Sequence, residues 1–234
     1  METKFKELAS KLNITLSDAE VDKFFLYKKI LKEWNEKINL TSIVDDNEIL
    51  IKHFIDSLTI EKYVPKNAKV IDVGTGAGFP GIPLKIVRPD IELILLDSLN
   101  KRINFLNEVV EKCGLRNVRT IHGRAEDYAK DVSYREKFDI STARAVANIS
   151  TLLEYCTPFL KIDGTFICMK ADAEQEIKEA SNAAKILNVQ KEIVDKFALP
   201  EIDAERTIIV YKKINSTPKQ YPRKAGMPAK EPLK

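Results

Sequence analysis

A glycine-rich segment carries the clearest chemical signal in this chain of 234 residues. It reads Val70-Ile71-Asp72-Val73-Gly74-Thr75-Gly76-Ala77-Gly78-Phe79-Pro80-Gly81, an apolar run followed by glycines at alternate positions. Glycine has no Cβ and adopts positive φ at little cost, so the backbone of such a turn can approach a ligand closely. The pattern predicts a strand, a tight turn and a helix, with a cofactor held against Gly74, Gly76 and Gly78.

Two classes of cofactor are compatible with this turn. The spacing Gly76-x-Gly78-x-x-Gly81 satisfies the dinucleotide fingerprint, in which a pyrophosphate lies on a helix N-terminus. Asp72, however, stands two residues before Gly74, at the carboxyl end of the predicted strand. A carboxylate there repels a pyrophosphate and attracts the ammonium group of a methionine moiety. Asp72 therefore favours S-adenosylmethionine.

Two later segments extend the predicted cofactor site. Asp97 ends the next predicted strand, 19 residues beyond Gly78, where a carboxylate can accept both ribose hydroxyls of an adenosine. This spacing suits either cofactor. Residues 123–126 follow the third predicted strand, where an adenine ring would lie against backbone and small side chains. The alternative for this segment is helix capping by Glu126 and Asp127.

The segment 141–148 follows the fourth predicted strand, at the edge where open α/β sheets place their chemistry. It lacks the Asn/Asp-Pro-Pro-aromatic pattern used on exocyclic amines and the Pro-Cys pair used on pyrimidine carbon-5. A ring nitrogen such as guanine N7 needs neither, because its lone pair is already available. Catalysis would then rest on alignment and electrostatics. Arg144 is the candidate that orients cofactor or base, with a surface salt bridge as the alternative.

The elements that must position these residues are of two kinds. The first 63 residues are predicted to form a cap of about three helices. Ser17 to Glu20 is a capping box, followed by an apolar stripe at steps of three or four, and Asp45 or Asp46 precedes a second stripe. The first stripe comprises Val21, Phe24, Tyr27, Leu31, Trp34 and Ile38, and the second comprises Ile51, Phe54, Ile55 and Leu58.

From residue 64 to residue 215 short apolar runs alternate with helical patterns, which predicts a mostly parallel, seven-stranded, Rossmann-like α/β sheet with helices on both faces. The predicted strands are 69–73, 92–96, 118–122, 138–142 and 165–170, and the amphipathic run 99–113 is a helix between them. Runs 190–199 and 206–213 are too close for a crossover and should pair antiparallel. Residues 216–234 are rich in Pro and Lys, which predicts a tail without regular structure.

Composition excludes several classes of protein. With 44% apolar and 31% charged residues the chain is expected to be a soluble globular protein. Cys113, Cys156 and Cys168 form neither a disulfide framework nor a zinc pattern, and His53 and His122 are too isolated to bind metal. The two later cysteines are expected to be core thiols rather than nucleophiles. Without an apolar leader or a membrane-length apolar stretch, we expect a cytoplasmic protein. We also expect a monomer, although the sequence does not give the oligomeric state.

The net charge of +3 is unevenly distributed. Residues 212–234 include seven basic side chains and one acidic, whereas the preceding 211 residues carry 31 basic and 34 acidic. A basic terminus is typical of a contact with a polyanion, although it also serves solubility.

Taken together, these residues resemble the glucose-inhibited division protein B family, bacterial methyltransferases of a guanine N7 in small-subunit ribosomal RNA. The resemblance spans nearly the whole chain. The glycine loop is shared with many methyltransferases, whereas the segments 53–58 and 221–230 are specific to the family. The matching segments are residues 34–41, 53–58, 72–83, 95–98, 101–102, 105–106, 143–145 and 221–230.

The resemblance implies a class I methyltransferase fold that binds S-adenosyl-L-methionine and methylates a loop of the 16S ribosomal RNA near the decoding site. It implies cofactor contacts at Gly74, Phe79, Ala125, Glu126 and Arg144, with Asp97 added by the general fold and Ser98 beside it in a matching segment. The ribosomal RNA or the ribosomal subunit would be the partner.

Basic side chains that could flank the carboxyl edge of the sheet are the predicted RNA contacts, although each could equally be a solvated surface charge. They are Lys101, Arg102, Arg124, Lys170, Arg223, Lys224 and Lys230. Two rival functions stay open: a small-molecule methyltransferase, for which the basic tail is irrelevant, and a non-catalytic RNA-binding assembly factor with a vestigial pocket. On the RNA hypothesis, deletion of residues 216–234 should abolish RNA methylation and spare cofactor affinity. Binding of S-adenosylmethionine separates the enzymes from the assembly factor.

Overall fold

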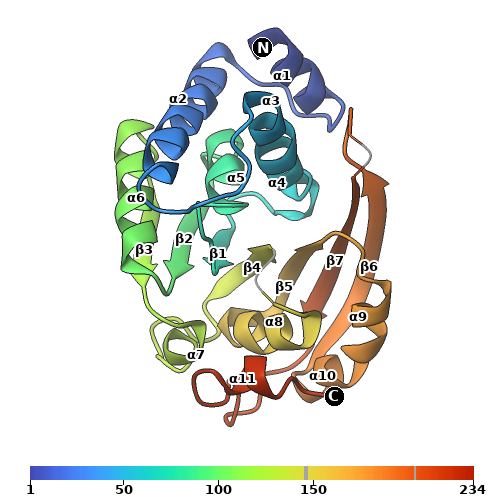
Figure 1. Ribbon diagram of the computed structural model, residues 1–234. Helices are drawn as coiled ribbons and strands as arrows, with labels where there is room; N and C mark the ends of the chain where they lie inside the picture. The colour runs from blue at the N-terminus through green and yellow to red at the C-terminus, as the bar shows by residue number, and fades with distance from the viewer. Residues whose placement is uncertain (145–146, 203) are drawn as a thin grey trace.

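A single seven-stranded sheet forms the centre of the computed structural model, which describes residues 1–144, 147–202 and 204–234 (Figure 1). Its strand order is β3-β2-β1-β4-β5-β7-β6. The first five strands pair in parallel, β7 is antiparallel to β5, and β6 is antiparallel to β7. The predicted fold class is therefore confirmed. The strands are β1 (Lys69–Val73), β2 (Glu92–Asp97), β3 (Val118–His122), β4 (Phe138–Arg144), β5 (Leu160–Lys170), β6 (Val189–Ala198) and β7 (Glu205–Lys213).

Two strands are longer than their sequence patterns predict. β4 continues to Arg144, because Ala143 pairs with Cys168 and Arg144 with Met169, so these two residues belong to the strand and not to the expected loop. Ala145 and Val146, also part of that expected loop, lie outside the described residues. β5 begins at Leu160 instead of residue 165, with a register irregularity where it pairs near Phe138. The first residues of β5 are mostly polar, so the apolar pattern did not indicate that they belong to the strand.

Helices cover both faces of the sheet because its strands alternate their buried side chains. Val70 and Leu95 join one hydrophobic core, and Ile71 and Leu96 join the other. The N-terminal helices, α5 (Gly81–Val87) and α6 (Asn100–Lys112) pack on the first face. The second face carries α8 (Ile149–Cys156) and α10 (Ser181–Ile186). The shorter elements are the 3₁₀ turns Glu61–Tyr63 and Thr157–Phe159, α7 (Ala125–Tyr128) and α9 (Glu174–Glu179).

The N-terminal segment forms three helical stretches, as predicted. They are α1 (Glu2–Ser10), α2 (Asp18–Asn35) and a composite helix made of α3 (Asp46–Glu48), a π-helical segment (Ile49–Ile55) and α4 (Asp56–Leu58). The Ser17–Glu20 capping box is present, and Asp45 accepts the amide of Glu48 as the second cap. α2 ends at Asn35, before Ile38, so the predicted stripe outruns the helix by three residues.

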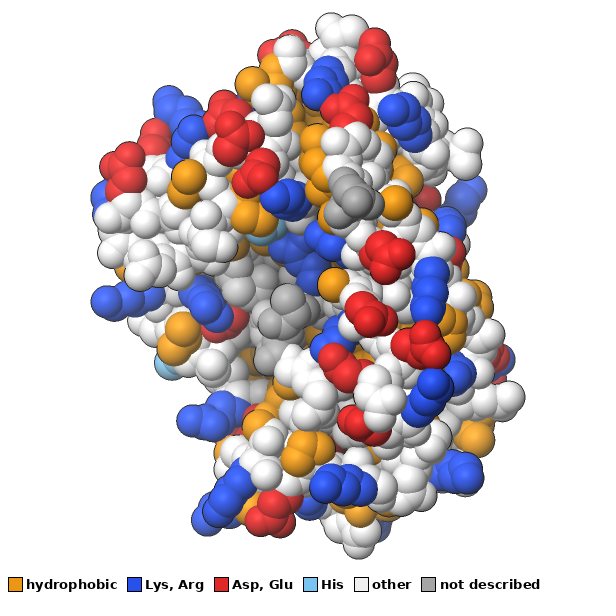
Figure 2. Space-filling model, turned by 45° about the vertical axis from the view of Figure 1, so that its right-hand side comes forward, with side chains coloured by type: hydrophobic (Ala, Val, Ile, Leu, Met, Phe, Trp, Pro, Cys, Tyr) orange, Lys and Arg blue, Asp and Glu red, His pale blue; other side chains and the backbone are white. Residues whose placement is uncertain are grey.

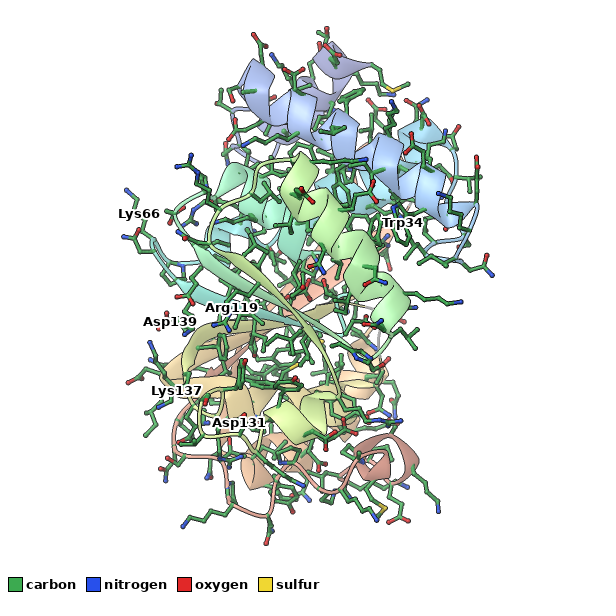
Figure 3. All side chains as sticks on the ribbon, turned by 90° about the vertical axis from the view of Figure 1, so that its left-hand side faces the viewer. Trp34, Lys66, Arg119, Asp131, Lys137 and Asp139 are labelled. Atoms are coloured by element: carbon green, nitrogen blue, oxygen red, sulfur yellow. The ribbon has the colours of Figure 1, made fainter. Side chains whose placement is uncertain are left out.

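The N-terminal helices share one hydrophobic core with the sheet. Phe24, Tyr27 and Phe54 are buried in the same cluster as Val70 and Leu95. Trp34 reaches α6 from the end of α2, where its indole Nε1 donates to Glu108 at 2.8 Å (Figure 3). The helical cap is thus built into the core that supports the glycine turn.

The C-terminal segment has more structure than its composition predicts. Residues 227–230 form a short helix, α11 (Met227–Lys230), which packs on α8. Gly226 precedes it with φ of +84°, and Pro228 lies in its first turn, where no backbone N–H is needed. The expectation of a tail without regular structure was therefore wrong for residues 227–230, whereas the other residues from 216 to 234 lie outside helices and strands. Buried contacts with the core nevertheless hold the segment in place.

No helix in the described parts of the chain has the length and apolarity needed to cross a membrane.

Candidate active site

A cavity of about 230 Å³ opens at the carboxyl ends of β1, β2 and β3. Its wall combines the first glycine of the turn, the end of β2 and the segment that begins α7. In open α/β sheets this edge, beside the point where strand order reverses, is where ligands bind. The lining residues are Val73, Gly74, Leu96, Asp97, Ser98, Gly123, Arg124, Ala125, Glu126 and Tyr155.

The glycine turn has the backbone conformation that its residues predict. Gly74, Gly76 and Gly78 all have positive φ, between 61° and 92°. A Cβ at Gly78 would lie 2.8 Å from the Tyr27 hydroxyl, which donates to the carbonyl of Ala77. Helix α2 therefore supports the turn from behind, and that side admits only a glycine.

Asp97 ties this turn to the end of β2. Its Oδ2 accepts the amide of Gly76 at 2.8 Å, and its Oδ1 accepts the amide of Leu99 at 2.9 Å. Arg102 lies 3.3 Å from Oδ2. The carboxylate is only 2% exposed and lines the cavity, so it is held in place with acceptor capacity left for a ligand.

Asp72 lies beneath the turn and is fully buried. Its Oδ2 accepts hydrogen bonds from the Thr75 hydroxyl at 2.6 Å and from the Gly81 amide at 2.9 Å. Gly81 begins α5, so Asp72 occupies a donor that a dinucleotide pyrophosphate would use. Among the described residues, Oδ1 of Asp72 is buried without a partner. Burial raises the pKa of this carboxyl to about 6, against the hydrogen bonds of Thr75 and Gly81.

This donor and acceptor set fits S-adenosylmethionine better than a dinucleotide. Oδ1 of Asp72 is buried without a donor from any residue that the structure describes, and it does not line this cavity, although Val73, the next residue, does. A cationic amino group that reached this oxygen would supply the missing donor. Asp97 offers acceptors for ribose hydroxyls, and Ala125 leaves space for a flat ring. Glu126 is 4% exposed and also lines the cavity.

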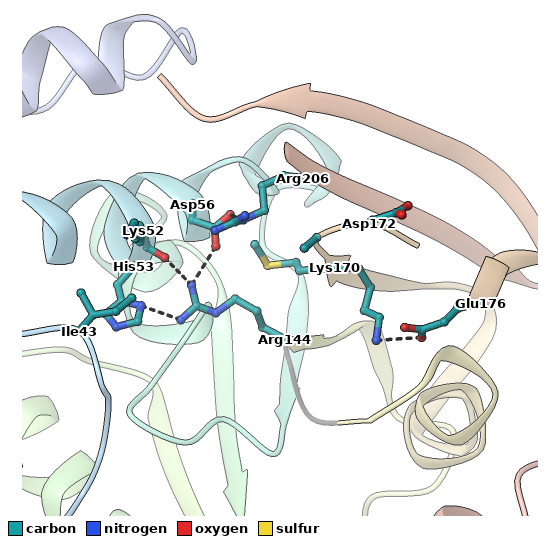
Figure 4. A pocket seen from close by; sticks show the side chains of 11 residues that line it. Ile43, Lys52, His53, Asp56, Arg144, Lys170, Asp172, Glu176 and Arg206 are labelled. Carbon is teal, nitrogen blue, oxygen red and sulfur yellow. Dashed lines mark hydrogen bonds and ion pairs between the residues drawn. The ribbon is translucent and has the colours of Figure 1, made fainter. Parts of the chain in front are cut away.

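A second cavity, of about 460 Å³, lies on the β4 and β5 side of the same edge (Figure 4). Side chains from the N-terminal cap, the sheet and α9 meet in it. Basic side chains gather in the hollow on this face of the molecule (Figure 2). Its lining residues are Ile43, Lys52, His53, Asp56, Arg144, Met169, Lys170, Ala171, Asp172, Glu176 and Arg206.

Arg144 is held from four sides in this second cavity. Its Nη1 donates to Oδ2 of Asp56 at 3.0 Å and to the carbonyl of Lys52 at 3.1 Å, while Nη2 donates to Nδ1 of His53 at 3.0 Å. The guanidinium also lies over the ring of Phe79, 4.8 Å from its centroid. The side chain is 14% exposed. Arg144 is thus a fixed, partly accessible cation and not a surface salt bridge.

His53 is a neutral hydrogen-bonding residue in this network. Burial, assisted by the charge of Arg144, lowers its pKa to about 3. Arginine only donates, so Nδ1 of His53 must be the acceptor and Nε2 carries the proton toward the Thr41 hydroxyl, 2.8 Å away. The ring stacks on Phe79 at 4.4 Å between centroids. The π-helical segment thereby connects Arg144 to the glycine turn.

Two members of this network, Asp56 and Arg206, were not among the predicted site residues. Asp56 is buried and joins Arg144 to Arg206, whose Nε lies 3.0 Å from Oδ1 of Asp56. Burial raises the pKa of Asp56, and both guanidinium groups oppose that rise. An acidic residue within the apolar stripe 51–58 was the available clue. Arg206, on β7, is distant in sequence, and Tyr155 in the first cavity likewise shows no motif.

The structure separates the predicted cofactor residues into three groups. Those lining the first cavity are Gly74, Asp97, Ser98, Ala125 and Glu126. Three others belong to the glycine turn or lie directly beneath it: Asp72, Gly76 and Gly78. Phe79 and Arg144 belong to the second cavity's network, where Phe79 is buried beneath His53 and Arg144.

The predicted RNA contacts differ in their availability. Lys101, Arg124, Lys224 and Lys230 are exposed. Lys170 pairs with Glu176 at 2.8 Å, and Arg102 lies beside Asp97. Arg223 pairs with the buried Glu154 at 2.7 Å. Part of the tail's basic charge is therefore used inside the molecule.

Acidic, His and Cys side chains do not gather into a group of three that could hold a metal ion, in the residues that the structure describes. The three cysteines are buried, free thiols.

Comparison with known proteins agrees with this architecture. A family model described as rRNA small subunit methyltransferase G matches residues 20–208. A protein of Acetivibrio thermocellus named ribosomal RNA small subunit methyltransferase G is 53% identical over 228 residues, 97% of this chain and 94% of that protein. A protein of the same name from Clostridium beijerinckii is 50% identical over 238 residues, covering 99% and 100%.

Solved structures resemble the fold at low sequence identity. The B. subtilis M1A22 tRNA methyltransferase TrmK has a TM-score of 0.55 at 15% identity, covering 70% of this chain and 67% of that one. M. jannaschii TYW2 in complex with AdoMet has a TM-score of 0.52 at 16% identity, covering 68% and 77%. These two likenesses concern the fold alone. The sequence matches extend over almost the whole length of the chain and show that it belongs to the rRNA small subunit methyltransferase G family.

Proposed function

We propose that this protein transfers a methyl group from S-adenosylmethionine to the N7 of a guanine in the RNA of the small ribosomal subunit. The observation that carries the proposal is the pair of cavities on either side of the β1/β4 junction. One has the glycine turn and Asp97 in its wall, and the other has Arg144 and Arg206. The 16S RNA and the location near the decoding site come from the family resemblance.

The first cavity would hold the cofactor. We assign the ammonium group to Asp72, the ribose hydroxyls to Asp97 and the adenine end to Ala125 and Glu126, with Gly74 and Ser98 in contact. When bound, the cofactor supplies an electrophilic methyl group on a sulfonium centre. The protein's part is to fix the direction of that group relative to the second cavity.

The second cavity would receive the target base. Its volume of about 460 Å³ falls within the roughly 300–1,000 Å³ range of ligand pockets. Guanine presents O6 and N7 as acceptors on one edge, and an arginine that donates to O6 alone leaves the in-plane lone pair of N7 free to attack. Arg144 would orient the base, and no group need remove a proton because N7 attacks through its own lone pair. Good alignment lowers the barrier by up to about 7–11 kcal/mol.

RNA phosphates would be neutralised by exposed basic residues around these cavities. We retain Lys101, Arg124, Lys224 and Lys230 in this role, since they are exposed. The side chains of Arg102, Lys170 and Arg223 are engaged in ion pairs, so a contact with RNA would have to compete with Asp97, Glu176 or Glu154. We further propose that the protein acts as a cytoplasmic monomer, which light scattering and cell fractionation would test.

Methyl transfer to defined substrates tests the proposal. Tritiated S-adenosylmethionine would be supplied with naked 16S RNA, a partly assembled subunit and the mature small subunit, and the modified base then mapped. We expect label on one guanine N7 with at least one substrate, and loss of label in Arg144→Ala. Label on small molecules alone would favour a small-molecule enzyme, and no binding of S-adenosylmethionine would favour a non-catalytic assembly factor.

A further inference from the structure

The C-terminal segment 221–230 lies against the wall of the first cavity, where it contacts Glu126 and helix α8. Upstream of it, Arg135 fixes the approach, because its guanidinium donates to the carbonyls of Thr217 and Tyr221 at 2.8 and 2.9 Å. Arg135 also donates to the carbonyl of Ala129, next to α7. The tail is thereby directed back toward the helix that carries Glu126.

A buried ion pair then anchors the segment to α8. Glu154 is 0% exposed, and its carboxylate accepts the backbone N–H and the side-chain Nε and Nη2 of Arg223, at 2.7 to 3.1 Å. A buried carboxylate without such a partner is strongly unfavourable. Tyr155, the next residue on α8, lines the first cavity. The anchoring point is thus one residue from the cavity wall.

The contact that reaches the cavity itself is made by Gly226. Its backbone N–H donates to Oε1 of Glu126 at 2.8 Å. Glu126 is 4% exposed and lines the first cavity. Two residues further on, the carbonyl of Pro228 accepts the Thr151 hydroxyl at 2.9 Å, which fixes α11 on α8.

We propose that Arg223 and Gly226 are positioning residues for the cofactor, which hold Glu126 and the α8 side of the first cavity through the docked tail. The inference rests on the proposed cofactor site and goes beyond it, because it assigns the tail a role in cofactor binding in the absence of RNA. It also reverses the expectation that deleting the tail spares cofactor affinity.

Linkage gives this proposal a reciprocal consequence. If a docked tail strengthens cofactor binding, a bound cofactor must strengthen tail docking by the same factor. Lys224 and Lys230 flank Gly226 and are exposed, so RNA that binds them more tightly in the docked than in the undocked state would strengthen tail docking and, through it, cofactor binding. Binding of RNA to the tail would then increase the affinity of the first cavity for the cofactor.

A matched pair of glycine substitutions tests the positioning role in the full-length chain. Gly226 and Gly114 have φ of +84° and +59°, and a Cβ at either would meet no atom within 4 Å. Alanine therefore adds backbone strain of the same kind at both, but only Gly226 contacts Glu126. With S-adenosylhomocysteine as the calorimetric probe, we expect Gly226→Ala to raise Kd about three- to tenfold and Gly114→Ala to leave it unchanged.

Hydrogen exchange supplies a second readout that a merely structural tail would not move. Saturating S-adenosylhomocysteine should slow exchange of the Gly226 amide in the wild-type chain, and Lys219→Ala, an exposed change in the tail, should preserve that protection. Equal Kd values for the two glycine variants, or exchange at Gly226 that ignores the ligand, would overturn the coupling alone. A wild-type chain that binds no S-adenosylhomocysteine would overturn the proposed cofactor and the coupling with it.

Discussion

Asp56 on the composite N-terminal helix holds Arg144 at the end of β4, with 3.0 Å between Oδ2 and Nη1. The same carboxylate binds Arg206 from β7. A residue of the helical cap therefore fixes the cation proposed to orient the target base. Cap and sheet meet in one functional network because Asp56 is buried between two guanidinium groups.

Replacing Arg144 by alanine should slow methyl transfer in single-turnover assays by about 10²-fold while the fold is retained, because misplacement of the base by about 1 Å costs that much. Arg144→Lys should rescue little, since one ammonium cannot reproduce contacts to Asp56, His53 and the Lys52 carbonyl together. A normal single-turnover rate in Arg144→Ala would remove this residue from the mechanism.

Asp56→Asn should reproduce part of the Arg144 defect without touching the cofactor. The amide keeps an acceptor but removes the charge that fixes the two arginines, so we expect a slower single-turnover rate with an unchanged Kd for S-adenosylhomocysteine. Asp90→Asn is the matched control, because Asp90 binds Arg88 at 2.8 Å but lines neither cavity. Equal rates in the two variants would contradict a positioning role for Asp56.

Asp97→Ala should weaken cofactor binding by about 1–3 kcal/mol, because the ribose hydroxyls lose their acceptor. The amide of Gly76 loses its partner as well, so Asp97→Asn, which keeps a carbonyl oxygen there, should bind better than alanine. Calorimetry with S-adenosylhomocysteine measures both. Wild-type affinity in the alanine variant would exclude Asp97 from the site.

Cofactor affinity should depend on pH through Asp72. The raised pKa of about 6 means that the carboxylate facing an ammonium group is lost as pH falls below that value, so Kd should rise by about tenfold per unit below about pH 6. Asp72→Asn should flatten the profile of Kd against pH.

The free energy of unfolding of the unliganded chain depends on the Asp72 carboxyl in the opposite direction, decreasing as pH rises. The folded state keeps this proton up to about pH 6 and the unfolded chain releases it near 3.8, so this group's contribution is complete below 3.8 and lost as pH rises through 6.

Arg223→Ala should lower the free energy of unfolding by about 3–5 kcal/mol, because Glu154 is left as a buried charge without its partner. Denaturant melts would measure this. Lys212→Ala serves as the control, since its pair with the exposed Asp163 lies at the surface and should leave the transition almost unmoved. Equal transitions would mean that the Glu154 carboxylate finds other donors when the arginine is removed.

The sequence alone determined the class of the sheet, mostly parallel with an antiparallel pair at its end, and several residues of the first cavity. These features are local in the sequence: apolar runs that alternate with helical patterns, glycines that allow positive φ, and acidic residues at two strand ends. Each depends only on neighbouring residues, so it can be predicted without the tertiary structure. The helix Asn100–Lys112 and the antiparallel β6–β7 pair followed in the same way, within one or two residues.

Only the tertiary structure decided how distant segments complete the site. Asp56, Arg144 and Arg206 come together because β4 and β7 flank β5 and the composite helix that carries Asp56 lies across their ends, an arrangement without any short-range pattern. The tail likewise gains its order from buried partners, Glu126 and Glu154, rather than from its own residues. A buried charge is stable only beside a partner of opposite charge, and that partner can come from any part of the sequence. Such pairs can therefore be identified only from the complete fold.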